Sequence, residues 1–459
     1  MKRLLPRALS AMLVMVLFAA AVCAADSTSV DARRKEIKGK ILPKVAALRG
    51  LAYINDVPIK VVTPTRLEKY IRKNVDENMT DVEFRGYEKM LVYLGLLQPG
   101  TDLKETLIKA YSQQVAGFYD DDDKSFSIVE GSSMPAEMDA VTIAHELTHA
   151  LQDQHFGLSE MDDYTEHDDD ASLAVGALAE GDACEIMLRY ATGTAPRGKG
   201  PVLDYTRFMS LSLGPESMPG MPLILSQDML FPYTYGTRFI SNLLKTLGPD
   251  GPNMAFRDPP VSTAQIIEPD KYFRRQEPYI LELPDLTKSL GAGWKRIDQE
   301  PLGQFDLGIY ISVTTGSWGV DDAIRQWRGD MLAGYGGPED ADFFMVYKST
   351  WNSYEGAEAF RTRYARLIEA RFGDAKRTYE DAERVMWMRG GNLYYLGRKG
   401  CDVLVIENIP RDKGAEAILA SWDAPKVPFG IVRPIADTGR VQPAGTIPAK
   451  PAKGGKNRS

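Results

Sequence analysis

The feature that most constrains this chain is a pair of histidines, His145 and His149, four residues apart in an apolar stretch. The spacing of apolar residues predicts a helix over residues 137–153. Four helical residues correspond to a rotation of about 400° and a rise of about 6 Å, so the two imidazoles share one face. Both can then reach one Zn²⁺ at about 2.0–2.1 Å. Glu146 would lie beside this metal, where its carboxylate can take a proton from metal-bound water.

A catalytic zinc site takes three protein ligands and leaves a fourth position for water. All four histidines of the chain fall within residues 145–167, and His155 lies ten residues after His145. That offset is used in proteins where a glycine three residues after the second histidine turns the chain back toward the metal. This chain has Gln152 at that position. In an uninterrupted helix, His155 would point about 120° away from His149 and face away from the metal.

Glu180 is the stronger candidate for the third ligand. It lies in an Ala-rich, otherwise apolar segment, residues 169–192, for which we predict a second long helix. A lone carboxylate on an apolar helix face needs a partner, and a metal ion is a good one. We therefore favour Glu180 and keep His155 and the aspartates at 168–170 as alternatives.

The helix with the HExxH motif, followed by a helix with Glu-Gly-x-Ala, resembles the gluzincins, the zinc metallopeptidases of the peptidase MA-like superfamily. The chain also resembles a family of exported bacterial HExxH proteins over roughly residues 45–275. The shared phrases are residues 114–120, 145–156, 180–183 and 259–263. The resemblance implies a mainly helical, zincin-like metallopeptidase domain with a small edge β-sheet. It also implies that Glu180 is the third zinc ligand.

The same resemblance implies two further parts of the site. Strand-like residues at 118–119 and 125–129 flank an acidic turn, residues 120–124, and predict a hairpin. Gluzincins place an antiparallel strand along the cleft, where substrate adds by main-chain pairing, and this hairpin at residues 118–129 suits that role. Many also use a Tyr or His to stabilise the oxyanion, for which Tyr233 and Tyr235 are candidates by position, Tyr235 being our choice. Two aromatics that only pack a helix start are the alternative. Asp182 could orient a zinc-bound histidine, although it departs from the usual position of such a carboxylate.

The N-terminus has the pattern of a secretory signal peptide. Lys2, Arg3 and Arg7 precede an apolar run, residues 8–22, and small residues follow it. We expect cleavage after Ala24, which predicts export to the periplasm or the extracellular space with no stable membrane insertion afterwards. An uncleaved anchor and a lipid-modified Cys23 are the alternatives; the run is short for a membrane span, and the residue before Cys23 fits a lipoprotein poorly.

The remaining chain predicts an α+β protein. Residues 25–284 read as the helical metallopeptidase domain, with one of its helices over residues 234–247. Strand-like runs beyond residue 285 alternate with a helix and predict a second, α+β domain over residues 285–423. Residues 424–459 are rich in Pro, Lys and Gly without apolar periodicity and predict a disordered tail.

The composition argues against two classes of function, nucleic-acid binding and a structural zinc site built on Cys. The net charge of −8, with 63 acidic and 55 basic residues, and the lack of a basic aromatic stretch argue against nucleic acid as a partner. Cys184 and Cys401 are expected to be free thiols, too few for a four-ligand structural zinc site built on Cys. We therefore expect hydrolysis of a peptide or protein substrate, with Glu146 as general base. The alternatives are a structural zinc-binding protein and a zinc hydrolase acting on non-peptide substrates.

Overall fold

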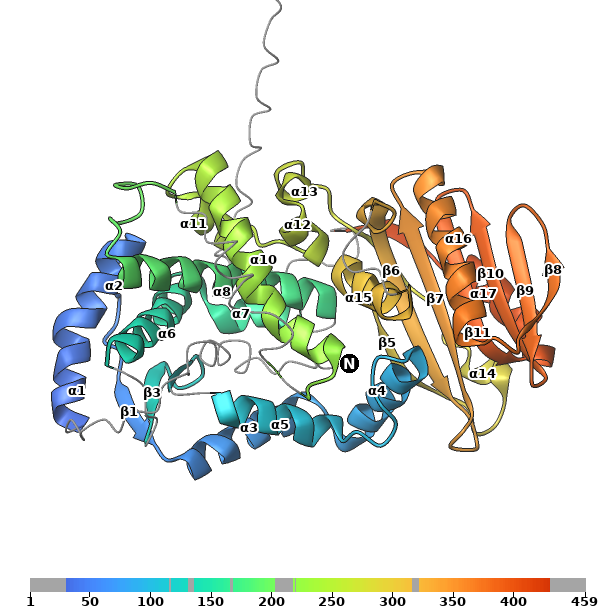
Figure 1. Cartoon of the computed structure of the whole chain (residues 1–459), viewed down its shortest axis with the longest axis horizontal. Helices are drawn as coiled ribbons and strands as arrows, with labels where there is room; N and C mark the ends of the chain where they lie inside the picture. Colours follow the sequence, from blue (N-terminus) through green and yellow to red (C-terminus); the bar gives the residue numbers. More distant parts are fainter. Residues whose placement is uncertain are drawn as a thin grey trace, which may run out of the picture.

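The computed structural model describes residues 30–114, 117–130, 136–165, 168–202, 218, 220–315 and 322–429. They form an elongated body with a helical part at one end and a large sheet at the other (Figure 1). The predicted α+β class is confirmed. The predicted signal peptide, residues 1–24, lies outside the described residues. Along the described chain, no helix combines the length and the apolar character needed to cross a membrane.

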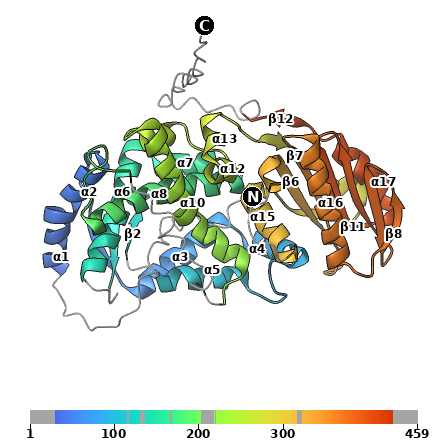
Figure 2. The same cartoon turned by 45° about the horizontal axis from the view of Figure 1, so that its top comes forward.

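The helical part starts with a long run of helices that Figure 2 shows in a second orientation. In chain order the elements are α1 (Val30–Glu36), a π-helical turn (Ile37–Ile41), α2 (Leu42–Arg49), β1 (Ile59–Val62), α3 (Pro64–Asn78), α4 (Asp81–Leu94) and α5 (Leu103–Gln114). Then come β2 (Gly117–Asp120), β3 (Ser125–Val129), α6 (Ala136–Phe156), α7 (Leu158–Tyr164) and α8 (Asp169–Thr192). Side-chain caps fix several helix starts: Thr63 accepts from the Arg66 N–H, and Thr80 forms a capping box with Glu83.

A three-stranded sheet in the order β1-β3-β2 lies in the helical part. β1 runs parallel to β3, whereas β2 and β3 form the predicted antiparallel hairpin, with Tyr119 opposite Phe126. In the turn, the Asp120 carboxylate accepts from the N–H groups of Asp122 and Asp123. Among the described strands β2 pairs only with β3, so it is an edge strand with its second edge turned away from the sheet.

Within the described residues, this part continues with α10 (Leu223–Leu247), α11 (Gly251–Arg257), α12 (Thr263–Ile267) and α13 (Pro269–Phe273). α10 begins eleven residues before the predicted start at residue 234 and contains Pro232. A proline inside a helix costs about 3 kcal/mol, which is why the sequence favours a later start. Leu225, Met229 and Phe231 are buried on this first segment, and their packing outweighs that cost.

α8 and α10 cross in close contact at two glycines. A Cβ on Gly181 would lie 2.3 Å from the carbonyl carbon of Gly236, and a Cβ on Gly236 would lie 2.1 Å from the Ala177 oxygen. No side chain fits in either place, so the two backbones can touch. This crossing lies one residue from Glu180 and fixes the position of that carboxylate.

The C-terminal part is a seven-stranded antiparallel sheet in the order β5-β6-β7-β11-β10-β9-β8. Its strands are β5 (Lys295–Glu300), β6 (Trp327–Gly336), β7 (Phe343–Trp351), β8 (Lys376–Glu380), β9 (Arg384–Arg389), β10 (Asn392–Lys399) and β11 (Asp402–Pro410). The helices are α14 (Thr287–Leu290), α15 (Gly303–Thr315), α16 (Tyr354–Arg371) and α17 (Arg411–Trp422). Alternate β7 side chains enter two cores, Met345 with α15 and α16, and Phe344 with α14 and α17.

The structure differs from the predicted domain boundaries near residues 285 and 424. The largest apolar core runs without a break from Leu67 in α3 to Val405 in β11, so the helical part and the large sheet share one core. Beyond residue 424 the chain still forms β12 (Lys426–Pro428), which pairs with β4 (Tyr279–Leu281). The predicted tail therefore starts too early, because backbone pairing stabilises a segment that lacks apolar periodicity.

Candidate metal centre

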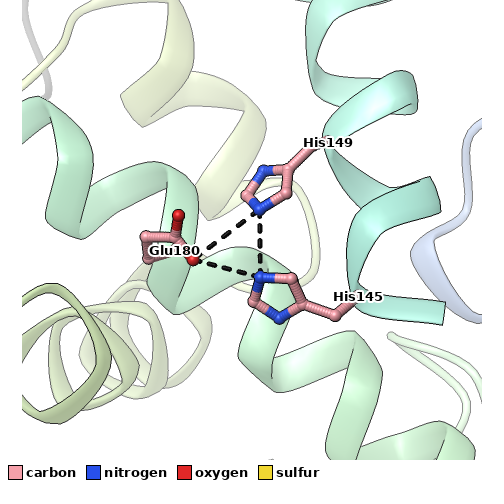
Figure 3. A group of neighbouring side chains, drawn as sticks. All are labelled: His145, His149 and Glu180. Atoms are coloured by element: carbon pink, nitrogen blue, oxygen red, sulfur yellow. Dashed lines mark hydrogen bonds and ion pairs between the residues drawn. The ribbon is translucent and has the colours of Figure 1, made fainter. Parts of the chain in front are cut away.

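Three buried side chains meet between α6 and α8 (Figure 3). His145 Nε2 lies 3.0 Å from Glu180 Oε2, and His149 Nε2 lies 3.6 Å from the same oxygen. The two Nε2 atoms are 3.0 Å apart. Of the described residues, these three make up the one group of His, Cys, Asp or Glu side chains whose ligand atoms all lie within 4.8 Å. The arrangement can hold a metal ion.

The other candidates for the third ligand lie elsewhere. His155 donates from Nε2 to the Ala52 carbonyl at 2.8 Å, because the helix continues past His149 and turns this side chain away. Asp168 caps α8, where its carboxylate accepts from the Ala171 N–H at 2.8 Å. Asp170 accepts from the Thr263 N–H. His167 is outside the described residues.

Gln152 fixes the orientation of His149. Its amide nitrogen donates to two acceptors, the Ala179 carbonyl and Asp182 Oδ2, each at 2.9 Å. The amide oxygen must therefore face His149, whose Nδ1 donates to it at 2.8 Å. A proton on Nδ1 leaves the Nε2 lone pair free to bind a metal. Gln152 stands where a glycine would turn the chain, and the glutamine instead holds His149 in place.

Behind Gln152 is a buried ion cluster made of Asp182, Glu185, Arg49 and Arg197. Asp182 accepts from Arg49 Nε at 2.8 Å and from an Arg197 guanidinium nitrogen at 2.7 Å. Arg197 also pairs with Glu185 at 2.7 Å. Burial alone would raise the pKa of Asp182, but the two arginines hold it below its usual value. Asp182 thus acts on the histidine through Gln152, and no local pattern marks Arg49 or Arg197 as its partners.

Glu146 lies beside the trio with one carboxylate oxygen held and the other unpaired. Its Oε2 accepts from the backbone N–H of Tyr119 in β2 at 3.0 Å. Its Oε1 is buried without a hydrogen-bond partner. Burial raises the pKa of Glu146 to about 8; the Glu180 charge adds to this rise and the His149 charge opposes it. A bound cation would favour the ionised form of this carboxylate.

The close contact of His145, His149 and Glu180 is stable only with one positive charge among them. Burial lowers the pKa of His145 to about 4. For His149 burial also lowers the pKa, but the Glu180 carboxylate outweighs it and raises the value to about 9. Two imidazole nitrogens and a carboxylate oxygen in contact need either a proton or a metal cation between them. Cys184 is a buried free thiol whose Sγ lies 4.0 Å from the opposite nitrogen of His145.

The structure does not bring Tyr235 to this site. Its ring stacks on Phe231, with centroids 4.9 Å apart, and the charges that shift its pKa after burial are those of Arg238 and Arg325. Tyr233 is buried, and after burial the charges of Glu180, Cys184 and Glu146 raise its pKa, so it lies within electrostatic range of the trio. Residues two apart on a helix point about 200° away from each other, so only one of the pair can face α8.

Comparisons with known proteins concern the other end of the molecule. Residues 292–419, which include the seven-stranded sheet, match a family described as a domain of unknown function (DUF8575). No curated protein and no solved structure matches the chain. The match does not reach α6 or α8, so what the metal centre does has to be inferred from its own geometry.

Proposed function

We propose that this protein is an exported zinc metallopeptidase of the gluzincin kind, with a zincin-like helical part. One observation carries the proposal: His145, His149 and Glu180 bring three ligand atoms together in a buried site, with the unpaired Oε1 of Glu146 beside them. Two imidazole nitrogens and one carboxylate oxygen are the ligand set of catalytic zinc in several hydrolases.

The number of ligands favours catalysis over a structural role. Structural zinc sites are usually closed by four protein ligands, whereas catalytic sites keep a position for water. The group found among the described residues has three members. The buried, unpaired Glu146 oxygen has no use in a purely structural site and is costly to maintain.

Glu146 is the general base of the proposed reaction. When bound, zinc lowers the pKa of its water and polarises the scissile carbonyl. The Tyr119 N–H anchors Glu146 Oε2, which leaves Oε1 to accept the proton from the attacking water. The same oxygen then delivers that proton to the leaving amine. Gln152 keeps His149 in one tautomer throughout, and Tyr233 takes the place of Tyr235 as the tyrosine on this side of α10.

The edge strand β2 supports a peptide as the substrate. Since the Tyr119 N–H donates to Glu146, the backbone of Tyr119 points away from β3 and toward the metal centre. In an antiparallel strand the N–H and C=O of one residue point the same way, so the Tyr119 carbonyl shares that edge. Since the Tyr119 N–H is committed to Glu146, the Tyr119 carbonyl is the group on this edge that would accept from an extended peptide and bring the peptide backbone near the trio.

The proposal of export rests on the N-terminal pattern. We propose that the segment up to Ala24 is removed as a signal peptide and that the mature chain acts in the periplasm or outside the cell. Mass spectrometry of the N-terminus of protein recovered from the periplasm tests this. A chain that begins at residue 1, or that stays in the cytosol, would contradict it.

The decisive experiment pairs metal analysis with cleavage of a broad peptide library. Wild type should contain about one zinc per chain and cleave peptides. Glu146→Gln should retain zinc but lose cleavage by at least about 10²-fold, because the proton acceptor is gone. Glu130→Gln, at an exposed position, is the matched control and should behave as wild type. Zinc-loaded wild type that cleaves no peptide but hydrolyses small esters would favour the non-peptide alternative.

A further inference from the structure

A second group of acidic side chains lies where the helical part meets the large sheet. Asp228 of α10 and Asp298 and Glu300 of β5 are buried. Asp306 of α15 is half-buried, but its Oδ1 is closed off from solvent. These four residues, called the junction cluster here, come from elements on both sides of the junction. None of them belongs to the metal centre.

The charges of the junction cluster act in two pairs, Asp228 with Asp306 and Asp298 with Glu300, and the charge of Asp169 raises the pKa of the acids in both pairs. Burial, and after it the charge of Asp306, holds the pKa of Asp228 well above its usual value, and the two side chains share a hydrogen bond. Burial, and after it the charge of Asp169, raises the pKa of Asp298 to about 8. Burial raises the pKa of the Tyr87 hydroxyl on α4, and the charges of four acids raise it further: Asp228, Asp306, Asp169 and Asp298. Both pairs of acids therefore lie within electrostatic range of Tyr87 and Asp169.

Asp298 gives an independent indication of a missing ligand. Its side chain is 3% exposed, and in the described structure neither of its carboxylate oxygens has a well-formed hydrogen bond; the adjacent Gln299 backbone N–H alone lowers its pKa by a hydrogen bond. One oxygen each of Asp228 and Asp306 is also buried and unpaired. Buried carboxylates are normally paired, protonated or bound to a metal ion, because an isolated buried charge is strongly unfavourable.

We propose that the junction cluster binds a hard divalent cation of the calcium class and so ties the large sheet to the helical part. The ligands on offer are all carboxylate oxygens, which suit Ca²⁺ and Mg²⁺ far better than Zn²⁺. No three of these acids have oxygens within 4.8 Å of one another in the described structure. The cation therefore keeps water in part of its coordination shell, as both of these ions commonly do.

The location predicts a structural effect that is independent of hydrolysis. The ion would link α10, which carries Asp228, with β5, which carries Asp298, and both elements border the shared core. Since it binds the folded state alone, it stabilises that state by mass action. The proposal stands whether or not the metal centre proves to be a peptidase.

The test uses the full mature chain with its zinc site loaded, in buffer freed of other cations by a chelating resin. Ca²⁺, and separately Mg²⁺, is added up to about 10 mM, a range that covers weak extracellular calcium sites. Thermal unfolding and titration calorimetry are recorded. At a concentration about a hundredfold above Kd, Ca²⁺ should raise Tm by about 3 °C while the zinc content stays constant.

Two variants make the result specific. Asp298→Asn keeps the side-chain shape and removes a charge, so it should raise Tm in cation-free buffer and abolish the Ca²⁺ shift. Asp330→Asn is the control: this buried acid is already satisfied by the Gly303 N–H and the Tyr347 hydroxyl. It should lower Tm by the same amount with and without Ca²⁺. Asp306→Asn replaces Asp298→Asn if that variant does not fold.

Two outcomes would overturn the proposal. One is a wild-type protein whose Tm and binding heat do not respond to either ion, which would mean that protons alone neutralise the acids. The other is a Ca²⁺ shift that persists unchanged in Asp298→Asn and Asp306→Asn, which would place the ion elsewhere.

Discussion

Replacing Gln152 by leucine should lower the zinc affinity while the three side chains of the site stay in place. A leucine side chain is similar in size to glutamine. It offers no acceptor to His149 Nδ1 and no N–H donor to the Ala179 carbonyl or the Asp182 carboxylate. His149 then loses the contact that selects its tautomer and fixes its ring. Removal of partners that orient metal ligands typically costs about 10–100-fold in metal affinity.

The expected loss of zinc affinity can be compared with the free energies of the individual hydrogen bonds that Gln152 makes. A typical hydrogen bond contributes about 0.5–1.5 kcal/mol net, and a buried acceptor left unsatisfied costs about 1–3 kcal/mol. The bond to His149 alone corresponds to roughly a tenfold loss of affinity at its upper limit. The Ala179 carbonyl loses a donor in both the zinc-bound and zinc-free protein, so it lowers stability but not affinity. Asp182 keeps both of its arginines, so the ion cluster should survive.

The assay is zinc competition against a chromophoric chelator, together with the visible spectrum of the cobalt-substituted protein and thermal unfolding without metal. Gln154→Leu is the matched control on the same helix: its amide oxygen accepts from the N–H groups of Ile54 and Asn55 and does not touch the site. It should lower stability and leave affinity and spectrum unchanged. If Gln152→Leu matched this control in zinc affinity and cobalt spectrum, the positioning role of Gln152 would be refuted.

Three further predictions follow from the same geometry. Tyr233→Phe should reduce kcat by roughly 10²-fold if its hydroxyl stabilises the oxyanion, whereas Tyr235→Phe should leave kcat unchanged; equal effects would contradict the assignment of faces on α10. Gly236→Ala should lower Tm and zinc content because its Cβ meets the Ala177 oxygen, while Gly176→Ala, with open space, should raise Tm slightly. In cation-free buffer, stability should fall between about pH 4 and pH 8, because burial raises the folded pKa of Asp298 to about 8 above its unfolded value of about 3.9. The folded state then holds a proton that the unfolded state has lost, and Asp298→Asn should flatten this slope in pH-dependent unfolding.

The local geometry of the site was predictable from the sequence. A spacing of four residues places His145 and His149 on one helix face whatever surrounds them, since helix geometry is set by the backbone. The burial argument also identified Glu180, because an unpaired carboxylate in an apolar helix is costly wherever that helix packs. The hairpin of β2 and β3 follows in the same way from strand-forming residues on either side of a polar turn.

The contacts between distant segments were decided only by the tertiary structure. Whether Tyr233 or Tyr235 faces the trio depends on how α10 lies against α8, and that crossing is set by Gly181 and Gly236 together. The early start of α10, the strand β12 and the junction cluster likewise depend on partners far away in the sequence. Sequence periodicity reports the conformation of one segment. The energy of packing, pairing and charge neutralisation comes from contacts between segments, and no single segment encodes it.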